Sequence, residues 1–160
     1  MKILHVYKDF DPPVHGGMER HMALMCRFQR EWAEVEALVC SRSLCTHVEI
    51  RDGTRVTEVG ESAPVAPTFP RHLQRLAGDV VVVHTPNPTA ELSWLMARPP
   101  ARLIVRYQSD VVRQAAAMRM YAPVQMRFLR QAAMILVASQ QYVDTSPVLQ
   151  PVRDRCRVVP

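Results

Sequence analysis

The glycine pair Gly16-Gly17 is the part of the sequence that points most directly to chemistry, because it stands immediately before a segment with helical spacing. Two glycines let the backbone approach a ligand with no Cβ in the way. A helix that begins there presents N–H groups and the positive end of its dipole, which favour an anion such as a phosphate. A simple turn is the alternative for the pair. Glu19 has the alternative role of complementing the helix dipole.

Polar residues also follow three later apolar runs of the sequence. They are His84, Gln108, Ser109, Asp110 and Ser139. Histidine, aspartate and serine are residue types that move protons or bind hydroxyl groups, and glutamine can hydrogen-bond a sugar hydroxyl without exchanging a proton near neutral pH. Each has a structural alternative, because a histidine that closes a buried strand often only packs there, and Ser109, Asp110 and Ser139 stand where helix N-caps are found.

The elements that must position these residues alternate between strands and helices. Apolar runs predict strands at 2–7, 35–40, 80–83, 103–107, 134–138 and 157–159. Helical spacing predicts helices at 18–33, 71–77, 89–97 and 111–132, the last interrupted near 121–123, and a mixed helix and turn at 139–149. A hairpin is expected at 46–60 around Asp52-Gly53, followed by a proline-rich connection without regular structure at 63–70.

This alternation predicts an α/β fold, with a mostly parallel Rossmann-like sheet that carries helices on both faces. Ligands of such a sheet bind beyond the carboxyl ends of its strands. The glycine pair and the polar residues above all follow strands, so we expect them to gather at one edge of the sheet. The Gly-x-Gly-x-x-Gly fingerprint of nicotinamide-dinucleotide domains is absent, and no acidic residue closes the second strand at Cys40-Ser41-Arg42.

The composition bounds the class of protein. The chain has 160 residues, 48% of them hydrophobic and 22% charged, which fits one globular domain and argues against a disordered, collagen-like or membrane-spanning protein. The apolar N-terminal run is too short for a signal peptide or a membrane span. The cysteines Cys26, Cys40, Cys45 and Cys156 form no Cys-x-x-Cys pair, so we expect reduced thiols in the cytosol and no metal site.

The charge is basic, with a net value of +5, and Lys2 and Lys8 are the only lysines. Arginine suits phosphates and carboxylates because its planar fork donates two hydrogen bonds at once. The segment around the fourth predicted helix is rich in arginine, with Arg106, Arg113, Arg119, Arg127 and Arg130. These arginines fit a solvated face, an acidic ligand or an anionic membrane surface. Aromatic residues make up only 6% of the chain, which argues against nucleic acid as a partner.

Four motifs in order resemble those of one enzyme family. They are Pro13-x-x-Gly16-Gly17-x-Glu19-Arg20 after the first strand, 79–88 with His84-Thr85-Pro86-Asn87-Pro88, Ser109-Asp110-Val111-Val112 with Tyr121-x-Pro123, and 133–149 with Ser139-x-x-Tyr142. Over its whole length the chain resembles the N-terminal domain of the family 4 glycosyltransferases, retaining enzymes of the GT-B fold, and in particular the bacterial polysaccharide mannosyltransferase-like members.

The resemblance implies a function and a role for each site residue. Such enzymes move a hexose from a nucleotide sugar to a saccharide or lipid-linked saccharide acceptor, through two Rossmann-like domains of which the N-terminal one binds the acceptor. His84 and Asp110 would be catalytic on the acceptor side of the cleft. Gly16 and Gly17 would approach the donor diphosphate or the transferred sugar, and Gln108 and Ser139 would bind substrate. No metal or cofactor is implied, because helix dipoles and basic side chains stabilise the leaving diphosphate.

The sequence departs from the family pattern at two places. Gln108 stands where the family commonly has histidine, which leaves open a second interpretation as a non-catalytic carbohydrate- or partner-binding module. The closing Val158-Val159-Pro160 resembles the start of the family's second domain. We therefore expect residues 1–160 to be the N-terminal acceptor-side domain, without the nucleotide-sugar domain and inactive alone. The expected location is the cytoplasm, with peripheral contact at the inner membrane face left open.

Overall fold

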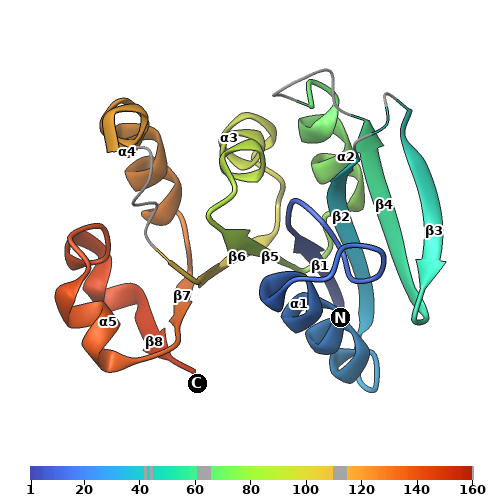
Figure 1. Cartoon of the computed structure of the whole chain (residues 1–160), viewed down its shortest axis with the longest axis horizontal. Coiled ribbons are helices and arrows are strands. Elements are labelled where there is room, and N and C mark those ends of the chain that lie inside the picture. Colours follow the sequence, from blue (N-terminus) through green and yellow to red (C-terminus); the bar gives the residue numbers. More distant parts are fainter. Residues whose placement is uncertain (42, 44, 61–65, 110–114, 160) are drawn as a thin grey trace.

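The structure of the protein is a computed structural model, which describes residues 1–41, 43, 45–60, 66–109 and 115–159. Strands and helices alternate along most of the chain (Figure 1). The strands are β1 (Lys2–Val6), β2 (Glu34–Ser41), β3 (His47–Arg51), β4 (Thr54–Gly60), β5 (Val80–Thr85), β6 (Arg102–Tyr107), β7 (Met134–Val137) and β8 (Cys156–Val158). The helices are α1 (Gly17–Gln29), α2 (Phe69–Leu76), α3 (Pro88–Ala97), α4 (Ala115–Leu129) and α5 (Gln140–Thr145), with a 3-10 helix at Gln150–Arg155.

The strands form one eight-stranded sheet in the order β3-β4-β2-β1-β5-β6-β7-β8. Every neighbouring pair is parallel except β3 and β4, which form the predicted antiparallel hairpin. Asp52 and Gly53 take the positive φ angles of 44° and 73° that a two-residue hairpin turn requires. The prediction of a mostly parallel sheet with one hairpin is confirmed.

Helices cover both faces of the sheet, as predicted. On one face α1 packs through Met22 and Cys26 against alternate residues of the central strands. On the other face α2, α3, α4 and α5 bury apolar side chains such as Leu73, Trp94 and Phe128 in a larger core. Figure 1 shows α1 below the sheet and α2 and α3 above it. Strand β5 lies between these layers, and its valines are therefore mostly buried on both sides.

The strand order also creates a topological switch point between β1 and β5. From β1 the chain passes through α1 to β2 and on to one edge of the sheet, and it then returns to β5 on the other side of β1. The connections that leave the carboxyl ends of β1 and β5 therefore run to opposite sides. Such a switch point is where open α/β sheets bind their ligands.

Several predicted element bounds were wrong. Helix α1 ends at Gln29 instead of residue 33, because its last turn tightens into bonds such as Trp32 N–H to Gln29 O (3.1 Å) before β2 begins. Helix α2 begins at Phe69, inside the expected connection, since Pro70 suits a first helical turn. The 3-10 helix after α5 was not predicted at all.

The predicted interruption of the fourth helix was also wrong. Helix α4 runs through Pro123 without a break. A proline removes one backbone hydrogen bond and costs about 3 kcal/mol in a helix interior. Beyond it Phe128 and Leu129 are fully buried, so packing holds the helix together where local propensity would end it.

Candidate functional site

Gly16 and Gly17 lie where the loop after β1 enters α1, beside the switch point. Gly16 is the N-cap residue of α1, with extended backbone angles that any residue can adopt. A Cβ at Gly16 would collide with the carboxylate of Glu19, whereas a Cβ at Gly17 would meet nothing within 4 Å. A side chain at position 16 would therefore displace the Glu19 carboxylate, which folds back over the start of the helix.

A shallow pocket of about 410 Å³ opens at this helix start, and Arg20 contributes to its wall. The first N–H groups of a helix have no partner within the helix, and here the first helical bond runs from Arg20 N–H to Gly16 O (3.0 Å). The nearby Glu19 carboxylate offsets part of the helix dipole, while the Arg20 guanidinium adds positive charge. The remaining lining residues are Asp11, His15, Gly16 and Gly17.

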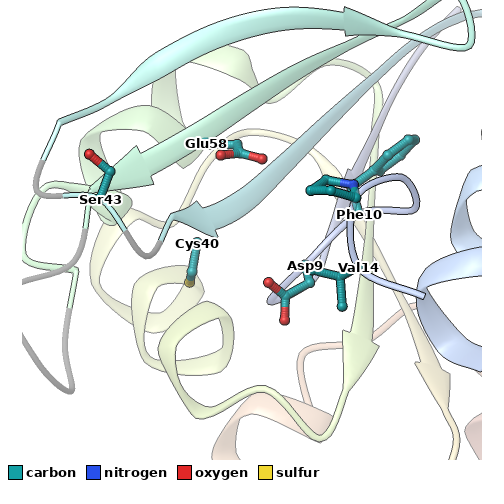
Figure 2. Close-up of a pocket in the computed structure, with 7 residues that line it drawn as sticks. Asp9, Phe10, Val14, Cys40, Ser43 and Glu58 are labelled. Carbon is teal, nitrogen blue, oxygen red and sulfur yellow. The ribbon is translucent and has the colours of Figure 1, made fainter. Parts of the chain in front are cut away.

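A second pocket, of about 340 Å³, lies on the other side of the same loop. Figure 2 shows Asp9, Phe10 and Val14 of the loop on one side and Cys40, Ser43 and Glu58, from the ends of β2 and β4, on the other. The carboxylate of Glu58 forms ion pairs with Arg51 and with His47 (2.8 Å). Carboxylate, hydroxyl and apolar groups thus meet at the carboxyl edge of the sheet.

His84 ends the buried run of β5 and is fully buried. Its Nε2 lies 3.0 Å from Nδ1 of His5 on the neighbouring strand β1. Burial lowers the pKa of His84 well below its usual value, and the nearby His5, His21 and Arg106 lower it further. His84 is therefore a neutral imidazole at physiological pH.

His5, His21 and Gln29 complete a polar cluster that the sequence analysis missed. His5 is fully buried, its pKa is lowered by burial to about 4, and its Nε2 lies 2.7 Å from Gln29 Oε1 on α1. The His21 ring lies 6.4 Å from the His84 ring. Alternation along β1 and β5 puts His5 and His84 on the face that α1 covers, and that periodicity was the available signal.

Three buried polar atoms at this edge of the sheet have no hydrogen-bond partner among the described residues. They are His84 Nδ1, Asn87 Nδ2 and Gln108 Nε2. The backbone brings their segments together, because Thr85 pairs with Tyr107 and the Gln108 N–H donates to Thr85 O (3.3 Å). Most buried polar groups in proteins are hydrogen-bonded, so each of these atoms offers an unused hydrogen bond to a ligand or a water molecule.

Arg106 is buried, although its place in the arginine-rich segment suggested a solvated face. Its side chain is only 7% exposed, and its Nη1 donates to Val159 O at 2.8 Å. Arg106 is the strand partner of His84, so its charge faces the histidine cluster and not a solvated surface. Arg127 and Arg130 are exposed on and just after α4, whereas Arg113 lies outside the described residues.

The remaining predicted site residues are placed as follows. Ser139 is the N-cap of α5, where its Oγ accepts from Tyr142 N–H at 3.2 Å, and it is exposed at the end of β7, two strands away from β5. Asp110 lies outside the described residues. The structure therefore brings the segments of His84 and Gln108 together near α1, and it places Ser139 farther along the same edge.

Of the four cysteines, Cys40 lines the second pocket described above. Cys26, Cys45 and Cys156 are free thiols, and Cys26 and Cys156 are buried. Within the part of the chain that the structure describes, no group of three or more His, Cys, Asp or Glu side chains is arranged to hold a metal ion. Over the same residues, no helix has the length and apolar character needed to span a bilayer.

Comparison with known proteins places the chain in a family. Residues 16–160 match the glycosyl transferase 4-like domain. The chain is 31% identical, over 100% of its length, to the O-antigen chain mannosyltransferase C of Escherichia coli, and 29% identical, over 99% of its length, to the D-rhamnosyltransferase WbpZ of Pseudomonas aeruginosa. It spans 45% and 44% of those proteins, about half the length of each.

A solved structure supports the fold independently. The sucrose-phosphate synthase of Thermosynechococcus elongatus superposes with a TM-score of 0.72 over 99% of this chain and 47% of its own, at 13% sequence identity. At that identity the likeness concerns the fold alone. It agrees with the expectation that this chain has the architecture of one half of a GT-B fold.

Proposed function

Because this chain belongs to the glycosyl transferase 4-like domain family, we propose that it is the acceptor-side domain of a two-domain glycosyltransferase. The reaction is transfer of a hexose from a nucleotide sugar to a saccharide or lipid-linked saccharide, with retention of the anomeric configuration. The named relatives are a mannosyltransferase and a D-rhamnosyltransferase, which supports a hexose or deoxyhexose as the transferred group.

The observation that carries the proposal is the set of buried polar atoms without partners at the β1–β5 switch point. His84 Nδ1, Asn87 Nδ2 and Gln108 Nε2 offer hydrogen bonds that no described protein group takes up. A sugar carries hydroxyl groups that both donate and accept, so it can satisfy an acceptor and amide donors at the same edge. Such groups would fix the orientation of a saccharide against the rest of the enzyme.

The start of α1 has the complementary role in this proposal. The N–H groups of its first turn and the Arg20 guanidinium favour the diphosphate of the donor, and Gly16 keeps the approach clear of a side chain. Asp110, which follows β6 in the sequence, stays the second proposed catalytic residue beside His84. Stabilisation of the leaving diphosphate by these groups requires no metal ion.

The test is an assay of the full-length protein that contains this chain. Membranes of the host cell supply the acceptor, and labelled nucleotide-activated mannose, D-rhamnose and other hexoses supply the donor. We expect incorporation of one hexose into an extractable saccharide, and NMR of the product should give the same anomeric configuration as the donor. Saccharide binding without incorporation from any donor would instead favour the non-catalytic binding module, for which Gln108 is the relevant departure from the family.

A further inference from the structure

A continuous row of polar side chains runs from α1 across β1 to β5. Gln29 Oε1 lies 2.7 Å from His5 Nε2, and His5 Nδ1 lies 3.0 Å from His84 Nε2. Both distances are those of good hydrogen bonds. Both histidines are fully buried, so the protein and not solvent decides which ring nitrogens carry hydrogen.

With Oε1 of Gln29 facing His5, the direction of both hydrogen bonds follows. A neutral imidazole has one N–H donor and one acceptor nitrogen. An amide oxygen can only accept, so His5 Nε2 carries the hydrogen and His5 Nδ1 is the acceptor. The contact with His5 then requires the hydrogen on Nε2 of His84. The remaining nitrogen, His84 Nδ1, is left with a lone pair and no hydrogen.

The surroundings keep both rings neutral, so each ring has one donor and one acceptor nitrogen. Burial lowers the pKa of His5 and of His84, and the Arg106 guanidinium acts in the same direction on His84. The other side chains whose rings lie near His84 are Tyr7, whose pKa burial raises, and His21, whose pKa burial lowers. Burial is the largest cause that lowers the pKa of His84, followed by the nearby His5, His21 and Arg106.

We propose that Gln29 and His5 are positioning residues that hold His84 in a single tautomer, with an unprotonated Nδ1 that accepts a hydrogen bond from a substrate hydroxyl. Nδ1 has no partner among the described residues, and burying a polar atom without one is costly. A ligand O–H would satisfy it, whereas a ligand oxygen without a hydrogen would not. The tautomer rests on the geometry and on the neutral charge of both rings, and the assignment of the ligand as a sugar hydroxyl rests on the proposed function.

The tautomer can be measured directly on this chain. Two-bond ¹H–¹⁵N correlation spectra distinguish a protonated from an unprotonated ring nitrogen, and the His84 signals can be assigned by their loss in His84→Gln. At pH 7 we expect His84 with hydrogen on Nε2 only, and His5 also with hydrogen on Nε2 only. Hydrogen on Nδ1 of His84 would overturn the proposal, as would rapid exchange between the two tautomers.

A variant tests whether Gln29 is the origin of the preference. Gln29→Leu removes the accepting oxygen, so His5 can take either tautomer and the two His84 ring nitrogens should shift toward each other in the spectrum. Arg27→Leu, at an exposed position of the same helix, is the matched control and should leave both signals in place. Unchanged His84 signals in Gln29→Leu would contradict the role given to Gln29.

Kinetics of the full-length protein connect the tautomer to substrate. If His84 accepts a hydroxyl in the transition state, Gln29→Leu should lower kcat/KM by about tenfold, the effect of one weakened hydrogen bond, and Arg27→Leu should not. Normal kcat/KM in Gln29→Leu with a changed tautomer would overturn the link to substrate. The spectra need no turnover, so absence of transfer would count against the proposed function and leave the tautomer result standing.

Discussion

The burial of His84 could be predicted from the sequence, but its contacts with other side chains could not. Its place after an unmixed valine run predicts burial at a strand end, and the structure confirms it. His5 is 79 residues away from His84 in the sequence, and the parallel register of β1 with β5 brings the two rings together. Gln29 contacts His5 because α1 packs on this face of the sheet. The alternation along each strand predicts which face a residue takes, but no local pattern contains the register, so the contact between the two histidines could not be predicted.

The neutral buried histidines have a consequence for stability. The pKa of His5 is about 4 in the folded protein, against a usual value of 6.5, so the unfolded chain binds the additional proton between these limits. The free energy of unfolding should therefore fall as the pH drops from 6.5 toward 4, by about 2 kcal/mol from His5 alone between pH 7 and pH 5. His84 acts in the same direction.

Urea unfolding at pH 7 and pH 5 measures this effect. In His5→Gln the loss between the two pH values should be smaller by about 2 kcal/mol than in the wild-type protein, whatever the stability of the variant at pH 7. An equal loss in both proteins would mean that His5 is protonated in the folded state as readily as in the unfolded chain.

Helices α3 and α4 are linked by a side-chain hydrogen bond that could not be predicted from their sequences. Glu91 of α3 is fully buried; its Oε2 accepts from Tyr121 Oη of α4 at 2.7 Å, and its Oε1 accepts from Asn87 N–H at 3.1 Å. Burial raises the pKa of Glu91. The helical spacing of both segments was predictable. The predicted break at Pro123 was wrong because packing of α4 against the rest of the protein keeps that helix continuous.

A double-mutant cycle isolates this link between the two helices. Tyr121→Phe leaves one buried oxygen of Glu91 without its donor and should lower the free energy of unfolding by about 1–3 kcal/mol. In Glu91→Gln the same tyrosine change should cost less, because a neutral amide oxygen is a weaker acceptor than a buried carboxylate. Equal costs in the two backgrounds would mean that the hydroxyl and the carboxyl group do not interact.

For the molecule as a whole, the alternation of strands and helices was enough to predict the fold. A mostly parallel sheet with helices on both faces and polar residues at its carboxyl edge follows from the positions of the apolar runs alone. The strand order does not, because each crossover could have gone to either side of β1. That order creates the switch point, and it explains why Gly16 and His84 both lie beside it while Ser139 lies farther along the edge.

The basic charge of the whole molecule favours peripheral contact with an anionic membrane. With a net charge of +5 and exposed Arg127 and Arg130 at the end of α4, we expect binding to anionic vesicles at low salt that weakens as salt is added. Co-sedimentation of the chain with such vesicles measures it, with Arg127→Glu/Arg130→Glu expected to bind less. Equal sedimentation with neutral vesicles would remove electrostatic attraction as the cause.

If the β1–β5 switch point holds the reacting saccharide, residues beside it should determine kcat/KM for sugar transfer by the full-length protein. Measuring kcat/KM in variants of these residues is therefore the most direct test. His84→Ala and Gly16→Leu should each lower it by at least about tenfold, since one removes the proposed acceptor of a hydroxyl and the other fills the approach to α1. Gln74→Ala, an exposed position on α2, should match the wild-type protein. Equal kcat/KM in all of these folded variants would contradict the account.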